Sequence, residues 1–302
     1  MKRIGSAALA MGTVVVLAAA AEPDKAPPDI PKLKSAEQSA GFKPTGNFSR
    51  TDPKITAYYR CYYTGKLELP ESYDDLKMRQ GAKDGCKLND KKYDVFFYPI
   101  EAVASGHTPV TQSLVNATPE RQAMVVPHED FHPQVDGLPD RIGEAAATLV
   151  GFVTGAAALN RPPLDADLFL RKAEAVNDVF DRLSAVYKKA RHGEISKRAA
   201  REEQQRLLGG FQVACSAIAP SPLSFNKCLS ASNNAGLAFD HTYTKFYPLI
   251  YGVYVSCGKD LRCTLEKILR APRKHREREV VAYFDGLSGL VPETGIVAIR
   301  AH

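Results

Sequence analysis

Hydrophobic positions in the second half of the chain recur every three or four residues, the spacing of one face of an α-helix. This spacing predicts a long helix over residues 165–191. Its apolar face consists of Leu168, Leu170, Ala173, Val176, Phe180, Leu183 and Tyr187. Residues 143–157 and 194–208 are also expected to be helical, the first rich in small residues and the second in charged ones. The aromatic residues over 239–254 are expected to pack mainly in the core. The pattern therefore predicts a mainly helical second half.

The first half of the chain shows a different pattern. Residues 93–100, YDVFFYPI, are largely β-branched and aromatic, which predicts a strand. Residues 110–115 are expected to form a second strand, and the tyrosine-rich residues 55–69 either a pair of strands or a short helix. A small sheet followed by many helices corresponds to the α+β class, mainly α.

The first 21 residues have the pattern of a signal peptide. Lys2 and Arg3 precede an apolar run over residues 4–17, and the small residues 18–21 offer a cleavage site. The alternative is an uncleaved membrane anchor, but the run is shorter than the roughly 20 residues that span a bilayer. No other stretch is apolar enough to cross a membrane. We therefore expect an exported protein, either periplasmic or secreted.

The rest of the chain divides into two parts. Residues 22–52 are rich in Pro, Lys, Ser and Gly and are expected to form a flexible linker. Residues 53–302 are expected to form one domain, because a chain with 44% hydrophobic residues can bury a sizeable core. Loss of the signal peptide removes two basic residues and no acid, so the net charge of +6 becomes +4. The charged runs at 194–208 and 270–279 interleave acids with bases, which is typical of solvated helix faces and not of nucleic-acid binding.

The six cysteines form an even number behind an export signal, which favours disulfides over free thiols. Proximity in the sequence suggests the pairs Cys61–Cys86, Cys215–Cys228 and Cys257–Cys263. The alternative is that some of these cysteines bind a metal. The chain contains no CxxC pair, however, and such pairs are the usual spacing of cysteine ligands.

A candidate metal site lies at residues 128–132, which read His-Glu-Asp-Phe-His and match the HExxH motif. In a helix predicted over residues 118–135, His128 and His132 lie four residues apart, so both side chains can reach one metal ion. Imidazole suits zinc, and a catalytic zinc has three protein ligands and one water molecule. Glu129 would lie beside the metal, where it can act as the base that takes a proton from this water.

The third ligand has three candidates, Asp136, Asp140 and Glu144. Asp136 would continue the face of the two histidines, but the glycine and prolines nearby indicate that the helix ends early. Glu144 opens the predicted helix over residues 143–157. A stripe of small residues lets this helix approach the metal helix closely: Ala147, Thr148, Gly151 and Gly155. Glu144 is therefore the preferred ligand, and the two aspartates are the alternatives.

The metal region also resembles a known family. HEDFHPQVDGLPDRIGEAAATLVG is similar to the metal region of the gluzincin metallopeptidases, in which a Glu on the next helix follows HExxH. Its short spacing and its GEAAATLVG phrase most resemble the bacterial predicted aminopeptidase family. The block NNAGLAFDHTYTKFYPLIYGVY is similar to a downstream phrase of that family, and the helical stretch between the two blocks is similar as well. The resemblance covers residues 93–269.

The resemblance implies a zincin-like domain, with a small sheet before the metal helix, and an exported zinc-dependent peptidase that acts on peptide substrates. The zinc ligands would be His128, His132 and Glu144. A Tyr or His on a later helix, here Tyr243 or His241, would donate a hydrogen bond to the oxyanion of the reaction.

Two further features bear on substrate binding. In zincins the substrate backbone pairs with a sheet edge, and residues 107–116 are the candidate for this edge. Asn233 and Asn234 would bind the substrate's backbone or its free amine, or would instead cap the helix that follows them. Whether the enzyme cleaves at chain ends or within chains stays open.

Pro127 directly precedes the first histidine of the motif, and Pro133 directly follows the second. A proline within a helix removes a hydrogen bond and clashes with the preceding turn. These prolines support an alternative function, that of a catalytically inactive envelope or secreted binding protein with a degenerate metal site. A third hypothesis is a helical exported protein in which the motif is accidental.

Overall fold

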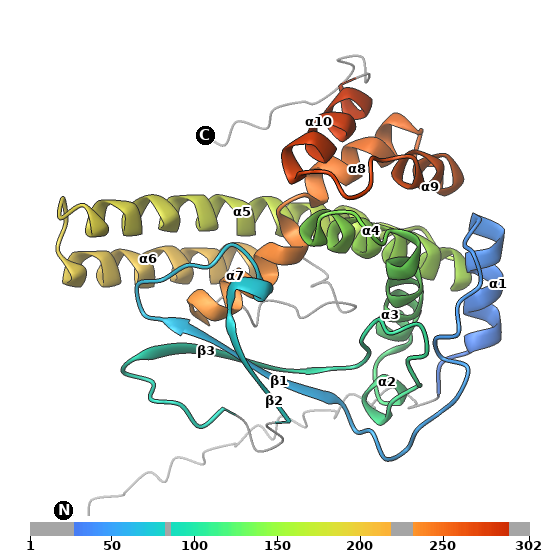
Figure 1. Ribbon diagram of the computed structural model, residues 1–302, viewed down its shortest axis with the longest axis horizontal. Helices are drawn as coiled ribbons and strands as arrows, with labels where there is room; N and C mark the ends of the chain where they lie inside the picture. Colours follow the sequence, from blue (N-terminus) through green and yellow to red (C-terminus); the bar gives the residue numbers. More distant parts are fainter. Residues whose placement is uncertain (1–26, 82–85, 219–231, 290–302) are drawn as a thin grey trace, which may run out of the picture.

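The chain folds into helices packed on one side of a small antiparallel sheet (Figure 1). The computed structural model describes residues 27–81, 86–218 and 232–289. The expected α+β class, mainly α, is confirmed. The predicted signal peptide over residues 1–21 lies outside the described residues. Within the described part of the chain, no helix combines the length and the apolar character that crossing a membrane requires.

The sheet has three strands, β1 (Tyr58–Gly65), β2 (Lys77–Gln80) and β3 (Tyr93–Ile100), in the order β2-β1-β3. Strand β3 confirms the strand predicted over residues 93–100. The tyrosine-rich residues 55–69 contain one strand, β1, and not a pair of strands or a short helix. Among the described residues the only strand that pairs with β3 is β1, and the Val95 carbonyl oxygen of β3 also accepts a hydrogen bond from the Asn233 side chain at 2.9 Å.

The prediction of a second strand over residues 110–115 is wrong. Only Val110 makes a β-bridge, to Thr51, and Gln112–Val115 form the short helix α2. The Thr111 side chain decides this, because its oxygen accepts a hydrogen bond from the Leu114 amide and so caps the helix. The segment 107–116 therefore does not form a strand edge, and the edge strands of the sheet are β2 and β3.

The expectation of a flexible linker over residues 22–52 is also wrong for residues 27–52, which the structure describes. Ile30–Ala40 form helix α1, whose Leu33 is buried in the main hydrophobic core. Asp29 caps this helix through the Lys32 amide, and a proline stands in its first turn, where proline is well tolerated. The Pro- and Lys-rich composition suggested a linker, but these residues start the helix and cover its exposed face.

The remaining helices follow the predicted order. They are α3 (Pro119–Phe131), continued by the 3₁₀ turn η2 (His132–Gln134), and α4 (Asp140–Ala158), α5 (Leu164–Arg191), α6 (Lys197–Ser216), α7 (Asn234–Thr244), α8 (Tyr247–Ser256), α9 (Leu261–Leu269) and α10 (Glu277–Ser288). Helices α5 and α6 form a long hairpin with its own apolar cluster, while α8 and α9 pack beside α4 and α10 packs on α8 (Figure 1). Helix α7 contacts both the sheet and α5, so it connects the hairpin to the sheet.

Two of the three predicted disulfides are present, Cys61–Cys86 and Cys257–Cys263. The first joins β1 to the segment before β3, and the second joins the end of α8 to α9. The third predicted pair involves Cys228, which lies outside the described residues.

Candidate metal centre

Helix α3 carries both histidines of the motif. Thr118 caps the helix through the Arg121 amide, and the residues that follow place His128 and His132 one turn apart. Their Nε2 atoms lie 3.1 Å from each other. Pro133 lies in the 3₁₀ turn that begins at His132, so it marks the end of the α-helix without separating the two rings.

Helix α4 packs against α3 along the predicted stripe of small residues. A Cβ atom on Gly151 would lie 2.7 Å from the Met124 carbonyl oxygen, and one on Gly155 would overlap the Ala123 carbonyl oxygen. The two backbones therefore approach each other closely, as predicted. Pro127 lies inside α3 and has no N–H group for the Ala123 carbonyl. That oxygen faces Gly155 instead, where a Cα–H group can approach it.

This packing brings Glu144 of α4 onto the two histidines. Its Oε2 atom lies 3.3 Å from Nε2 of His128 and 3.4 Å from Nε2 of His132. Nitrogen and oxygen ligands at about 2.0–2.1 Å from a tetrahedral zinc ion lie about 3.3–3.4 Å from one another. The three ligand atoms therefore have the separations that one face of such a tetrahedron requires. His128, His132 and Glu144 can hold a metal ion.

The charges around the three residues favour a cation. Burial alone would raise the pKa of Glu144, but the two histidines hold it well below its usual range. Burial would likewise lower the pKa of His132, but the charge of Glu144 raises it to about 9. The Oε2 atom of Glu144 is buried, and no donor among the described residues hydrogen-bonds to it. These features suit a positive ion between the three side chains.

A cavity of about 420 Å³ opens over the three ligands. The side chains of His128 and Glu144 are 8% and 10% exposed, whereas that of His132 is 22% exposed, so solvent reaches the centre past His132. Asp136 and Asp140, the alternative third ligands, line this cavity but do not belong to the ligand group. The preference for Glu144 therefore agrees with the geometry.

Glu129 and Tyr243 line the same cavity. Burial raises the pKa of Glu129, and Glu144 adds to this effect, while the two histidines oppose it. Burial also raises the pKa of Tyr243 well above its usual value, so its hydroxyl keeps its proton at neutral pH. The ring of Tyr243 lies 6.3 Å from that of His128, measured between centroids.

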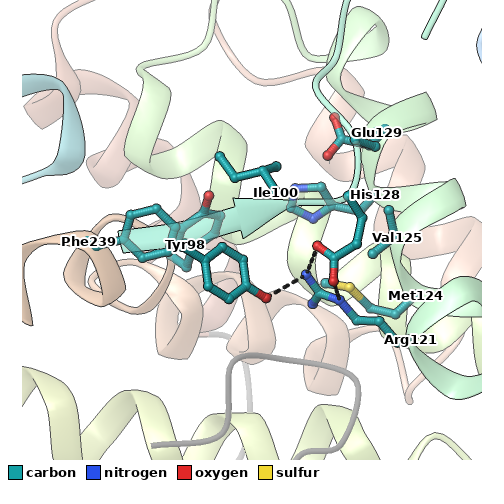
Figure 2. A pocket seen from close by; sticks show the side chains of 11 residues that line it. Tyr98, Ile100, Arg121, Met124, Val125, His128, Glu129 and Phe239 are labelled. Carbon is teal, nitrogen blue, oxygen red and sulfur yellow. Dashed lines mark hydrogen bonds and ion pairs between the residues drawn. The ribbon is translucent and has the colours of Figure 1, made fainter. Parts of the chain in front are cut away.

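A smaller recess of about 50 Å³ adjoins this cavity and shares Glu129, His128 and Tyr243 with it. In this recess Arg121 binds Glu101 through two nitrogens, at 2.8 and 3.0 Å. Figure 2 shows the Tyr98 hydroxyl pointing to the same guanidinium group, at 3.2 Å. The ion pair balances the charge of Arg121 with that of Glu101, and no sequence motif indicated it.

The other predicted site residues lie elsewhere. His241 does not line the cavity. It hydrogen-bonds through Nδ1 to the Glu71 carbonyl oxygen at 2.7 Å and stacks on Phe180. Asn233 caps α7 through the Gly236 amide, and Asn234 is fully buried, where Tyr187 donates to its side-chain oxygen. None of these three residues lines the metal cavity, so their contact with substrate stays a prediction, and the capping interpretation of Asn233 is confirmed.

Sequence reasoning missed Tyr73. Its hydroxyl lies 2.8 Å from Oε1 of Glu144, the carboxylate oxygen that faces away from the histidines. Tyr73 belongs to the 3₁₀ turn η1 (Tyr73–Asp75), far from the motif in sequence and without a motif of its own. In comparisons with known proteins, the chain matches no family model, no curated protein and no solved structure.

Proposed function

We propose that the chain is an exported zinc-dependent peptidase of the kind that the resemblance to bacterial predicted aminopeptidases implies. One observation carries the proposal: His128, His132 and Glu144 present three ligand atoms at tetrahedral separations, in a cavity that Glu129 also lines. Zinc is the metal proposed, because two imidazoles and one carboxylate form a common catalytic zinc set. A bound zinc ion would supply Lewis-acid chemistry, lowering the pKa of a water molecule and polarising a substrate carbonyl.

Glu129 is the proposed general base. Among the described residues, no side chain hydrogen-bonds to its carboxylate, so the group is available to accept a proton from the attacking water. Glu129 then returns this proton to the leaving amine. Tyr243 is the proposed oxyanion donor, because its protonated hydroxyl belongs to the same cavity. A donor aimed at the developing negative charge contributes about 3 kcal/mol to the transition state.

The C-terminal end of the edge strand β3 suits a peptide substrate. Residues 100 and 102–104, at and just after the end of this strand, line the cavity beside Glu129. An extended peptide can pair its backbone with such an edge, whatever its side chains are. The pairing would carry the scissile bond towards the metal centre.

An exported location fits the two disulfides among the described residues, because disulfides persist mainly in oxidising compartments. The signal-peptide pattern over residues 1–21 supports the same proposal. The proposed site of action is therefore the periplasm or the exterior of the cell.

One observation favours the second candidate, a binding protein without catalysis. Nδ1 of His128 is buried and has no hydrogen-bond partner in the part of the chain that the structure describes. Histidine ligands of zinc almost always donate this N–H group to an acceptor, and loss of such a partner weakens metal binding about 10- to 100-fold. A weak centre of this kind would bind metal without efficient hydrolysis.

Metal content tests the centre first. Purified wild-type protein is expected to contain about one zinc ion per chain, because three protein ligands and a cavity are present. Glu144→Gln should lose most of this zinc. Asp136→Asn is the matched control, since Asp136 lines the cavity outside the ligand group. Wild-type protein that stays metal-free in added zinc would contradict the proposal.

Hydrolysis then separates the two candidates. Wild-type protein is screened against peptide and amino-acyl substrates beside Glu129→Gln, which keeps the size of the side chain and removes the base. The variant should keep its zinc and lose about 10²- to 10⁴-fold in kcat. Zinc binding without any hydrolysis by the wild type would favour the binding protein, and full activity of Glu129→Gln would remove Glu129 from the role of base.

A further inference from the structure

We propose that Tyr73 is a positioning residue that makes Glu144 a one-oxygen metal ligand and so keeps a coordination position open. The inference rests on the metal centre of the proposed function and adds a residue that carries no motif. It follows from the different partners of the two carboxylate oxygens of Glu144.

The two oxygens of Glu144 have different partners. Oε2 faces the Nε2 atoms of His128 and His132, at 3.3 and 3.4 Å. Oε1 accepts a hydrogen bond from the Tyr73 hydroxyl, at 2.8 Å. A carboxylate can bind a metal through one oxygen or through both. Because Tyr73 engages Oε1, only Oε2 is directed at the ion.

The surroundings of Tyr73 fix where its hydroxyl points. Its ring packs among three other aromatic rings, those of Tyr62, Phe239 and Tyr243, with centroids 6.0 to 6.2 Å away. Its backbone N–H donates a hydrogen bond to Oγ1 of Thr242, at 2.8 Å. The side chain and the backbone are therefore both anchored to α7.

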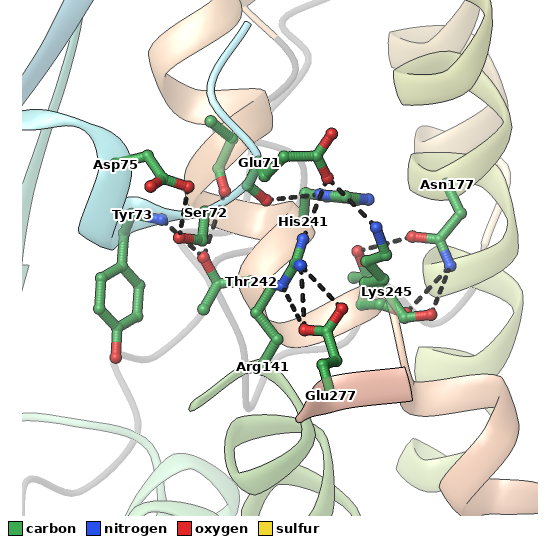
Figure 3. A network of polar contacts seen from close by, with 12 residues as sticks. Glu71, Ser72, Tyr73, Asp75, Arg141, Asn177, His241, Thr242, Lys245 and Glu277 are labelled. Atoms are coloured by element: carbon green, nitrogen blue, oxygen red, sulfur yellow. Dashed lines mark hydrogen bonds and ion pairs between the residues drawn. The ribbon is translucent and has the colours of Figure 1, made fainter. Parts of the chain in front are cut away.

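A polar network holds the segment before Tyr73 in place (Figure 3). Glu71 accepts hydrogen bonds from Arg141 at 3.0 Å and from Lys245 at 3.2 Å, and its carbonyl oxygen contacts His241 at 2.7 Å. Arg141 also binds Glu277 of α10 through two nitrogens. Arg141 lies one turn before Glu144 on α4. The helix that carries Glu144 therefore also binds the segment that carries Tyr73, the residue that orients the Glu144 carboxylate.

Four-coordinate zinc with three protein ligands leaves one position for water, which catalysis requires. A second oxygen from Glu144 would occupy or crowd that position. Hydrogen bonds to metal-binding carboxylates also strengthen metal affinity, and their loss typically weakens binding about 10- to 100-fold. Tyr73 is thus expected to affect both the affinity and the coordination number of the centre.

The test compares Tyr73→Phe with Tyr62→Phe. Each variant removes one hydroxyl from neighbouring rings that line the same cavity, but of the two hydroxyls only that of Tyr73 has a described hydrogen bond to Glu144. Zinc affinity is measured by competition with a chelator, and coordination number from the visible spectrum of the cobalt-loaded protein. Tyr73→Phe should bind zinc about 10- to 100-fold more weakly and show a weaker, higher-coordinate cobalt spectrum. Tyr62→Phe should resemble the wild type in both.

Thermal unfolding of the metal-free proteins checks that the variants fold. If Tyr73→Phe does not fold, Thr242→Val replaces it, because this change removes the backbone anchor of Tyr73 and should shift both quantities in the same direction. Wild-type values of either quantity in the folded variant would overturn the role of Tyr73 while leaving the zinc centre intact. Wild-type protein that binds no zinc would overturn both.

Discussion

His241 and Tyr243 show how much two positions on one helix can differ. They are two residues apart on α7, and such residues do not face each other on a helix. Tyr243 consequently reaches the metal cavity, while His241 lies against Phe180 and the Glu71 carbonyl oxygen. The two could not both have been oxyanion donors. His241 instead holds the segment that carries Tyr73.

The environment of His241 predicts a pH dependence. Burial is the main reason that its pKa falls from 6.5 to about 4, and the nearby charge of Lys245 adds to this. Below pH 6.5 the unfolded chain therefore binds a proton that the folded chain excludes. The free energy of unfolding should fall by about 1.4 kcal/mol per pH unit from this group, and by about 3 kcal/mol in all at pH 4.

Urea unfolding at pH 7.5, 5.5 and 4.5 measures this contribution. His241→Asn keeps an N–H donor for the Glu71 carbonyl but cannot titrate, so its stability should fall less steeply with acid than that of the wild type. His192→Asn, at an exposed position, is the control and should follow the wild type. Equal slopes for wild type and His241→Asn would show that His241 does not govern acid sensitivity.

At the scale of elements, the contact between α3 and α4 brings the three candidate metal ligands together. The histidines lie on one helix and Glu144 on the other, so their separations depend on how closely the two backbones approach. Glycines at 151 and 155 permit this approach, and Gly155 also accommodates the carbonyl oxygen that Pro127 leaves without its helical partner. Pro127 therefore does not prevent the three candidate ligands from lying together.

Gly155→Ala should separate the two helices. Its methyl group would overlap the Ala123 carbonyl oxygen, a backbone atom that cannot turn aside. Overpacking of this kind destabilises by about 1–3 kcal/mol, and zinc affinity should fall as the ligands move apart. Urea unfolding and chelator competition measure the two effects.

Gly209→Ala in α6 is the matched control, because a Cβ atom there meets nothing within 4 Å. It should stabilise the protein by about 1 kcal/mol through helix propensity and leave zinc affinity unchanged. A Gly155→Ala protein as stable as the control, with wild-type affinity, would show that the close approach is not needed.

At the scale of the whole molecule, the disulfides restrict the unfolded chain. Cys61–Cys86 spans 25 residues, whereas Cys257–Cys263 spans 6. On the chain-entropy relation these loops correspond to about 3.5 and about 2 kcal/mol of stability. The double variant Cys61→Ala/Cys86→Ala should therefore lose more free energy of unfolding than Cys257→Ala/Cys263→Ala. Urea denaturation without reductant measures both losses, and the reverse order would contradict the entropic account.

Local spacing was enough to predict much of this molecule. The strand at Tyr93–Ile100 and the long α5 helix have side-chain periods that belong to a single segment. Segment 110–115 was predicted wrongly because one capping threonine outweighed its strand-forming residues, and residues 30–40 because composition concealed a capped helix. In both cases a hydrogen bond at a helix start decided the structure.

In the candidate site, too, local features could be predicted from the sequence and long-range contacts could not. The sequence by itself determined that His128 and His132 share a helix face, that Glu129 stands beside them, and that a glycine stripe lets α4 come close, because each depends on residues within one or two turns. Only the tertiary structure decided that Glu144 and not Asp136 joins the two histidines in a group that could hold a metal ion, that Tyr73 hydrogen-bonds to the second oxygen of Glu144, and that His241 lies against the Glu71 carbonyl oxygen. Those outcomes depend on the packing of segments far apart in the chain, and no local period records the distances between them.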